Sequence, residues 1–231
     1  MASDQKKVVI SLGGSLIVPD DIDVPFLSSF KKLIEDYVAK GWQFLLITGG
    51  GKTARRYQKA AGEVADLSSD ELDWVGIHAT RLNGHFLRII FKELAYEDVV
   101  TDPAGLPGAP KSVIVGAGWK PGWSTDFDAV ELAEKVGAKR IINLSNIDYV
   151  YDKDPRTNKD AKRIEKISWS EFRKILPPPE AWNPGLNAPF DPVAAKRAEG
   201  FGIEVVVMNG KNLDNLKKAL EGEDFEGTII K

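Results

Sequence analysis

The sequence predicts an α/β protein, built as a three-layer α/β/α sandwich around a mainly parallel sheet. Apolar runs that are typical of strands alternate with amphipathic runs that are typical of helices, which indicates parallel strands covered on both faces. Several expected strands end in glycine or in Asp, Ser and Thr, at the edge where open α/β sheets bind ligands. Neither an internal repeat nor a domain linker is visible, so we expect residues 1–231 to form a single domain.

The first part of the chain is expected to alternate between strand and helix. Residues 7–12 (KVVISL) form a short apolar run and are expected to be a buried strand. Apolar residues then recur at helical spacing over residues 26–38, and Gly41 follows where a helix commonly ends. A second strand is expected at residues 44–48, followed by a helix that ends near Asp66.

Capping signals and apolar runs define the middle of the chain. Ser68 and Glu71 have the spacing of a capping box, which predicts a long helix from there toward Ala95. A short strand is expected at residues 99–100, and a proline-rich loop extends from there to Pro110. Strands at 112–116 and 140–145 then flank a helix that begins at one of Ser124, Thr125 and Asp126, all good N-cap residues, and ends near Gly137.

The last third of the chain continues the alternation after an irregular stretch. Asp191 followed by Pro192 pairs an N-cap with a proline in the first helical turn, so a helix is expected to about Glu199. The other expected elements are a polar loop or hairpin at 156–166, a short helix opened by the capping-box pair Ser168 and Glu171, an irregular proline-rich stretch at 177–189, a strand at 203–208, a helix at 213–220 and a last strand at 227–230.

A glycine turn after the second strand indicates phosphate binding. Residues 44–48 run directly into Gly49, Gly50 and Gly51, and a helix follows at once. Glycines let the backbone approach an anion closely, and the first N–H groups of a helix have no internal partner. Lys52 and Arg55 add positive charge within one turn. The alternative is a tight strand–helix connection with nothing bound.

A second glycine turn, Gly13-Gly14-Ser15, ends the first strand and predicts a site for more than one phosphate group. The full dinucleotide pattern G-x-G-x-x-G and the P-loop pattern G-x-x-x-x-G-K-[ST] are both missing from the sequence. The dinucleotide-binding and Walker-type interpretations therefore lose their main support.

Composition excludes several other classes of protein. The net charge of −3 offers no general polycation for nucleic acid or for an anionic membrane, and no apolar run has transmembrane length. The lack of cysteine excludes a disulfide scaffold or a thiolate metal site. His78 and His85 are seven residues apart on one expected helix, about 10 Å along its axis, which is too far to share one metal. We expect a soluble, cytoplasmic protein that binds neither nucleic acid nor membrane.

The motifs together resemble the amino acid kinase superfamily, and most closely its archaeal-type uridylate (UMP) kinases, nearly from end to end. The Gly-Gly-Gly-x-x-Ala-Arg form of the glycine turn and the segment around Asp73 point to UMP kinases within that superfamily. The segments that carry the resemblance are 12–15, 48–57, 73–77 with Thr80, Arg81 and Asn83, 121–126, 146–155, 191–195, 207–209 and 227–230.

The resemblance implies Mg²⁺-dependent transfer of the ATP γ-phosphoryl group to UMP, in a homohexamer built from dimers. Asp126 and Asp191 would be the acidic pair that organises the reacting centre, although simple helix capping is the alternative for each. No direct protein ligand of the metal is predicted. UMP would be bound by Gly50, Asp73, Gly118, Trp119, Lys120, Pro121, Gly122, Trp123, Ser124 and Thr125. ATP would be bound by Gly13, Gly14, Ser15, Gly51, Arg55, Ser145, Tyr151 and Asp154.

The chemistry of this reaction suits the residues present. A nucleoside monophosphate has a second pKa of about 6, so it is mostly a dianion at neutral pH and needs no general base. The difficulty is to bring two polyanions together and to stabilise charge on the transferred group. Backbone N–H groups, a metal ion, arginine and lysine can do this.

The sequence departs from the family pattern at four positions. Ser11 stands where many relatives carry a lysine, and Tyr149 where a glycine is usual. Phe127 and Asp128 replace the usual small residues after Asp126. We expect another cation to replace the missing lysine. Lys52 is the first candidate and Lys120 the second, while a solvated lysine is the alternative for each.

Other interpretations remain open for the function and for two tryptophans. Trp119 and Trp123 flank the acceptor loop, where they either stack on a base or serve packing or a subunit contact. The chain could phosphorylate another small phosphate or carboxylate acceptor, as other kinases of the superfamily do. It could also be a non-catalytic relative that binds nucleotide or oxoanions, and Ser11 and Tyr149 favour that alternative.

Overall fold

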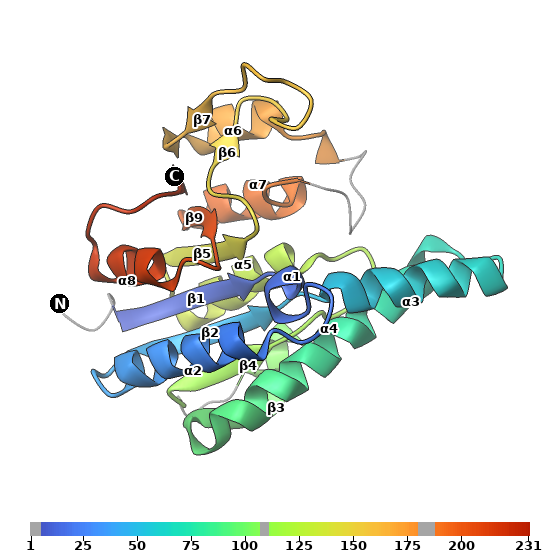
Figure 1. Ribbon diagram of the computed structural model, residues 1–231, viewed down its shortest axis with the longest axis horizontal. Coiled ribbons are helices and arrows are strands. Elements are labelled where there is room, and N and C mark those ends of the chain that lie inside the picture. Colours follow the sequence, from blue (N-terminus) through green and yellow to red (C-terminus); the bar gives the residue numbers. More distant parts are fainter. Residues whose placement is uncertain (1–5, 107–110, 180–187) are drawn as a thin grey trace.

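A twisted sheet runs through the computed structural model, which describes residues 6–106, 111–179 and 188–231 (Figure 1). Its eight strands lie in the order β3-β4-β2-β1-β5-β9-β10-β8, and β6 and β7 form a separate two-stranded sheet. The strands are β1 (Lys7–Leu12), β2 (Gln43–Thr48), β3 (Ala95–Val100), β4 (Val113–Gly116), β5 (Arg140–Ser145), β6 (Val150–Tyr151), β7 (Arg163–Ile164), β8 (Lys166–Ile167), β9 (Glu204–Asn209) and β10 (Thr228–Ile230).

The strand pairing confirms the prediction of a mainly parallel sheet. Strand β1 pairs in parallel with β2 and β5, β2 pairs in parallel with β4, and β5 pairs in parallel with β9. The last strand, β10, runs antiparallel to β9. Because these strands are parallel, their carboxyl ends meet at one edge of the sheet. The chain builds outward on both sides of β1, and open α/β sheets bind ligands at the carboxyl edge of such a point.

Helices cover both faces of the sheet, as the three-layer prediction requires (Figure 1). One core packs α1, α2, α4 and α8 against one face, and the other packs α5, α6 and α7 against the opposite face. Successive residues of β1 point to opposite faces, so Val8 and Ile10 belong to the first core and Val9 to the second. The helices are α1 (Gly14–Ile17), α2 (Val24–Val38), α3 (Gly51–Val64), α4 (Ser69–Phe91), α5 (Thr125–Val136), α6 (Trp169–Ile175), α7 (Pro192–Phe201) and α8 (Leu213–Glu221), with 3₁₀ turns η2 (Lys92–Leu94) and η3 (Pro103–Gly105).

Local capping signals in the sequence are confirmed at three helices. Both expected capping boxes are formed, by Ser68 with Glu71 at α4 and by Ser168 with Glu171 at α6. The side chain of Asp191 caps α7 and accepts two backbone N–H groups. These contacts satisfy donors that a helix cannot pair internally, which explains why short sequence patterns located the helix starts.

Some expected boundaries were wrong. The long helix was expected to extend toward Ala95, but α4 ends at Phe91 and Ala95 begins β3. Lys92 has a positive φ of 48°, which breaks the helix and redirects the chain into the sheet. The strand expected at 99–100 is therefore longer. Parts of the two stretches expected to be irregular, 107–110 and 180–187, lie outside the described residues.

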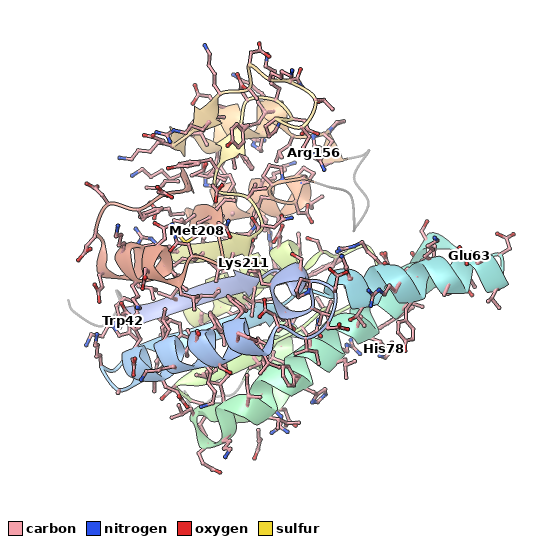
Figure 2. All side chains as sticks on the ribbon, viewed as in Figure 1. Trp42, Glu63, His78, Arg156, Met208 and Lys211 are labelled. Atoms are coloured by element: carbon pink, nitrogen blue, oxygen red, sulfur yellow. The ribbon has the colours of Figure 1, made fainter. Side chains whose placement is uncertain are left out.

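Helix α3 and the first half of α4 project together from the body of the protein (Figure 1). No residue of α3 is buried. Figure 2 shows Glu63 near the far end of α3 and His78 on α4, both at the outside. Among the described residues, no helix combines the length and the apolar character needed to cross a membrane.

Candidate active site

The two glycine turns lie against each other at the carboxyl edge of the sheet. A Cβ atom on Gly14 would lie 2.1 Å from the backbone N of Gly51, and a Cβ on Gly51 would lie 2.3 Å from the carbonyl O of Gly14. Gly51 also has a φ of +62°, which other residues rarely adopt. The turns that were singled out separately in the sequence therefore meet backbone to backbone, which only glycine permits.

Neighbouring strand ends hold this pair of turns in place. The N–H of Gly13 donates to the carbonyl of Leu144 at the end of β5 (2.9 Å), and that of Gly49 donates to Leu12 at the end of β1 (3.0 Å). Asn83 of α4 donates from Nδ2 to the carbonyl of Gly49 (2.8 Å). A Cβ on Gly50 would lie 2.6 Å from the Cβ of Ala54, so this position is also closely packed.

The cations predicted beside these turns are in place but differ in their contacts. Lys52 Nζ donates to Asp20 Oδ1 at 2.5 Å, and this hydrogen bond holds the pKa of Asp20 below its usual value. Arg56 Nη1 donates to the carbonyl of Asp20 (3.2 Å), while Arg55 is exposed. Lys52 therefore stands at the start of α3 as expected, with its ammonium group paired to an exposed carboxylate.

Asp126 and Asp191 come together beneath the glycine turns. Ser11 Oγ donates to Asp126 Oδ1 (3.3 Å), and the backbone N–H of Asp191 donates to Asp126 Oδ2 (3.2 Å). The hydroxyl of Ser11, at the position where the family resemblance leads us to expect a lysine, thus reaches the carboxylate of Asp126. Burial, followed by repulsion from Asp191, raises the pKa of Asp126 to about 7.

The buried side chain of Asp191 links α7 to the loop before α5. Its Oδ1 accepts the N–H groups of Val193 (2.6 Å) and Ala194 (3.1 Å). Its Oδ2 accepts a short hydrogen bond from Ser124 Oγ. Asp191 therefore caps a helix, which was the simpler of the two expectations, and it also contacts the predicted site.

The loop of residues 118–125, which we call the acceptor loop, is held by side chains of α4 and α5. Thr80 Oγ1 accepts the N–H of Gly118 (2.8 Å). Arg81 donates from Nε to the carbonyl of Gly118 (3.1 Å) and from Nη2 to that of Trp119 (2.7 Å). Asp128 Oδ2 accepts the N–H of Trp119 (3.2 Å).

Asp73 also contacts the acceptor loop. Its Oδ2 accepts the N–H of Gly122 (2.9 Å), and Gly122 has a φ of +81°. The residue was expected to bind a ribose. Here one of its carboxylate oxygens fixes the middle of the acceptor loop, so Asp73 brings α4 and that loop together.

Aromatic rings pack along the acceptor loop. Trp119 and Trp123 meet edge to face with centroids 4.6 Å apart, and Trp123 meets Phe127 at 4.2 Å. Lys120 Nζ lies 4.2 Å from the centroid of Trp119 and 4.6 Å from that of Trp123. Its ammonium group is thus occupied by a cation–π contact. Packing, one of the two expectations for these tryptophans, is what the geometry displays.

The residues expected around the adenosine lie in and beside the segment that carries β6. Ser145 ends β5, and its Oγ accepts the N–H of Ile147 (3.3 Å). Asp154 is paired with Arg156, which donates to it from its backbone N–H (2.9 Å) and from Nη2 (2.9 Å); these bonds lower the pKa of Asp154. Figure 2 labels Arg156 in this outlying part of the protein.

Tyr149 and Tyr151 are separated by one residue of this segment. Tyr151 pairs with Arg163 across the two-stranded sheet, and the guanidinium carbon of Arg163 lies 5.0 Å from the ring centroid of Tyr149. Val150, between the two tyrosines, is buried. The ring of Tyr149, at the position where the family resemblance leads us to expect a glycine, therefore lies against an arginine side chain.

Sequence reasoning gave no role to several residues that build the site. Thr80, Arg81 and Asn83 were noted only as parts of a motif, and Asp20 was not noted at all. Thr80 and Arg81 follow Asp73 by seven and eight residues, which is about two helical turns, so they lie on the same side of α4, and Asn83 follows Thr80 by three. The helical period counted from Asp73 was the signal that could have found Thr80 and Arg81. Asp20 lies in a polar loop that carries no such signal.

The described residues contain no group of three or more Asp, Glu, His or Cys side chains placed to hold a metal ion. Carboxylate oxygens are nevertheless the ligands that Mg²⁺ prefers, and in phosphate-transfer sites Mg²⁺ usually keeps several waters and binds substrate phosphates. The carboxylate of Asp126, which contacts Ser11 at the end of β1, has oxygen atoms that suit such an ion.

The chain is similar to known proteins in sequence and in structure. A model of the amino acid kinase family matches residues 6–209. The chain is 34% identical to the uridylate kinase of Sulfurisphaera tokodaii, over 97% of this chain and 98% of that protein. It is 37% identical to the uridylate kinase of Methanospirillum hungatei, over 96% and 94%. A crystal structure of uridylate kinase from Archaeoglobus fulgidus superposes with a TM-score of 0.80 at 36% identity, covering 97% of this chain and all of that one (100%).

Proposed function

The chain belongs to the amino acid kinase family, and we propose that it is a UMP kinase, which transfers the γ-phosphoryl group of ATP to UMP to give UDP and ADP. The observation that carries this proposal is the likeness to uridylate kinases over nearly the whole length of both chains. The meeting of two glycine turns beside an acidic pair supports it, because two phosphate-bearing substrates must be brought together there.

In the reaction, an α-phosphate oxygen of UMP attacks the γ-phosphorus of ATP. A new oxygen–phosphorus bond forms, the bond to the bridging oxygen breaks, and ADP leaves with the electron pair. Since UMP is already a dianion near neutral pH, the protein needs to position the two nucleotides and to offset their charge. Backbone N–H groups of the glycine turns, the start of α3 and nearby cations meet these needs.

UMP is proposed to occupy the space between α4 and the acceptor loop. Gly50 and Asp73 would contact its phosphate side and its ribose, and residues 118–125 would surround the uracil and the acceptor phosphate. One oxygen of Asp73 already binds Gly122, so its other oxygen is the one free to accept from a ribose hydroxyl.

ATP is proposed to lie on the other side of the glycine turns. Gly13, Gly14, Ser15, Gly51 and Arg55 would meet its phosphates. The adenosine would lie against Ser145, Tyr151 and Asp154, which requires Asp154 to share or release Arg156.

Asp126 and Asp191 are proposed to organise the reacting centre, with Ser11 orienting Asp126 and Lys52 offsetting charge on the transferred phosphoryl group. Mg²⁺, brought with ATP, would supply further charge neutralisation. It would be held mainly by phosphate oxygens and water, and Asp126 would be the protein residue that offers it a carboxylate oxygen. For Lys52 to contact phosphate, it must exchange its present partner, Asp20.

We further propose that residues 1–231 act as one domain, in the cytoplasm, and assemble into a homohexamer built from dimers. Helix α4 carries an exposed row of Trp74, Leu82 and Ile89, whose exposed fractions are 41%, 63% and 57%. Apolar side chains gathered on one helix face favour association with another protein surface. Light scattering would detect the assembly, and a monomer at working concentration would contradict it.

The decisive test of the reaction is a coupled assay of ADP release with purified protein, Mg·ATP and a panel of acceptors. We expect turnover with UMP and much less with CMP, AMP or acetylglutamate. Comparable turnover with all four acceptors would contradict specificity for UMP. If UMP binds in calorimetry but no acceptor supports ADP release, the non-catalytic alternative replaces the kinase.

A further inference from the structure

The first two residues of the acceptor loop have all of their backbone polar groups bound by side chains. The N–H and carbonyl of Gly118 are bound by Thr80 and Arg81, and the N–H and carbonyl of Trp119 by Asp128 and Arg81. Two of these side chains come from α4 and one from α5, so this dipeptide is held between two helices. Because each of its backbone polar groups is bound, the dipeptide Gly118–Trp119 cannot turn its peptide planes without breaking a hydrogen bond to one of those helices.

Asp128 is the unusual member of this set. Its side chain is 1% exposed, and its Oδ1 has no hydrogen-bond partner among the described residues. Burying an unpaired polar atom destabilises a fold by about 1–3 kcal/mol. The resemblance noted above leads us to expect a small residue here, which would avoid that penalty but would leave the N–H of Trp119 without this acceptor.

We infer that Asp128 is a positioning residue for the acceptor nucleotide: acting through the N–H of Trp119, and together with Arg81, it fixes the start of the acceptor loop in the conformation that receives UMP. The inference rests on the proposed function, because it assigns this loop to the acceptor. It assigns no contact between Asp128 and either nucleotide.

The consequence of this anchor extends along the loop. The ring of Trp119 packs against Trp123, and Lys120 lies over both rings, so the orientation of Trp119 is coupled to those of Lys120 and Trp123. Further along, Gly122 is held by Asp73, the residue proposed to bind the ribose. A loop that is ordered before the ligand arrives does not lose that conformational entropy on binding, which favours affinity.

The kinetic test compares Asp128→Ala with Asp128→Asn and a control. The asparagine side chain keeps an oxygen that can accept from Trp119, whereas alanine does not. Losing one hydrogen bond that orders the site corresponds to about a 5- to 10-fold change in affinity. We therefore expect Asp128→Ala to raise the KM for UMP about 5- to 10-fold with the KM for ATP unchanged, and Asp128→Asn to stay near wild type.

The control variant is Glu131→Ala. Glu131 lies on α5, as Asp128 does, but its side chain pairs with Arg197 of α7 and not with the acceptor loop. This variant should change neither KM. A loss of folding alone would lower the active fraction and hence the apparent kcat, but would not raise one KM selectively. If Asp128→Ala fails to fold, Arg81→Lys is the second variant, because lysine keeps the charge but lacks the rigid planar fork of N–H groups that holds both carbonyls. It should raise the same KM.

A second readout does not depend on activity. Amide hydrogen exchange of the segment around Trp119, in the protein without nucleotide, should be faster in Asp128→Ala than in wild type, Asp128→Asn or Glu131→Ala. Unchanged exchange in Asp128→Ala would overturn the anchor. Faster exchange with an unchanged KM for UMP would overturn the positioning role. If wild type does not phosphorylate UMP at all, the proposed function fails, and the exchange result still decides whether Asp128 holds the loop.

Discussion

The acceptor side and the donor side of the candidate site are built in different ways. Most of the acceptor loop's anchors come from residues nine to 49 positions away in the sequence, and Thr80 and Asp128 among them are buried. On the donor side, Asp154 pairs with Arg156 two residues away and Lys52 pairs with Asp20, 32 residues away, but these four side chains differ from Thr80 and Asp128 in being 41% to 72% exposed. The acceptor side is therefore organised by the fold. The donor side is organised by pairs of charges that phosphate can replace.

This difference suggests how the two sides respond to ligand. Exposed ion pairs contribute about 0–1 kcal/mol, so exchanging them for a phosphate needs little energy. The hydrogen bonds to Gly118 and Trp119 are buried or partly buried and are therefore costly to break, so the start of the acceptor loop should keep these anchors when UMP binds. The following predictions test this comparison, from the largest expected effect to the smallest.

The largest effect concerns the dependence of stability on pH, through Asp128. Burial raises its pKa to about 8, against an ordinary value of 3.8. Between these values the unfolded chain is ionised and the folded protein is protonated at this group, so unfolding releases a proton and stability falls as pH rises. In Asp128→Asn this contribution is missing. The variant should gain stability relative to wild type by about 1.4 kcal/mol per pH unit in that window.

Denaturant titrations of both proteins at several pH values would measure this difference. Below about pH 4 and above about pH 8 the difference should be level, because the group then has the same protonation state in both forms. Parallel stability curves across the whole range would mean that Asp128 titrates normally. The acceptor side would then be less deeply buried than the comparison requires.

The second effect concerns Lys52 on the donor side. Removing one hydrogen-bond donor from the place where charge develops in the transition state typically lowers turnover about 10²- to 10³-fold. Lys52→Met should therefore reduce kcat by about 10²-fold, with little change in either KM. The matched control is Asp20→Asn, which breaks the same ion pair but leaves the ammonium group in place.

The pair of variants separates two explanations. We expect Asp20→Asn to keep nearly full turnover, because the ammonium group remains available to phosphate. Equal losses in both variants would show that the ion pair itself shapes the site. If Lys52→Met is near wild type and Lys120→Met is nearly inactive, the cation lies on the acceptor side instead.

The third effect concerns the ribose contact proposed for Asp73. Hydrogen bonds to a charged group are worth about 1.5–3 kcal/mol, so Asp73→Ala should raise the KM for UMP about 10- to 150-fold. The KM for ATP should hardly change. Isothermal titration with UMP should show the same loss in affinity. Part of that loss would come from the acceptor loop, because the variant also removes the hydrogen bond to Gly122. Equal effects on UMP and ATP would mean that Asp73 is only structural.

The sequence predicted most of the fold because its signals were local. Glycine turns, capping boxes and the Asp191–Pro192 pair depend on a few neighbouring residues, and the structure has all of them. The end of α4 was missed because nothing local stops that helix. It ends where Lys92 adopts a positive φ and the chain turns into β3 to pair with β4. That outcome depends on the sheet, which a local pattern does not contain.

The candidate site was predictable to a different degree on its two sides. The positions of the glycine turns followed from strand ends, and that of Asp126 from the N-cap residues at the start of a helix, both of which are visible in a sequence. The partners of the acceptor loop were not, because Arg81 and Asp128 meet it only through the packing of α4 and α5. On the donor side the contact of Lys52 with Asp20 joins a helix to a loop 32 residues earlier, and no spacing rule indicates it.

The smallest effect concerns Arg156, whose pairing with Asp154 is exposed. If Asp154 contacts the adenosine, its carboxylate must first leave or share Arg156, and an exposed pair of this kind is worth about 0.2–1 kcal/mol. Arg156→Ala should therefore lower the KM for ATP by at most about fivefold, with the KM for UMP and the melting temperature unchanged. The control is Lys153→Ala, which breaks the neighbouring pair with Asp160 and should change neither KM. A higher KM for ATP in Arg156→Ala would instead mean that Arg156 itself binds the nucleotide. The donor side would then be organised in advance, as the acceptor side is.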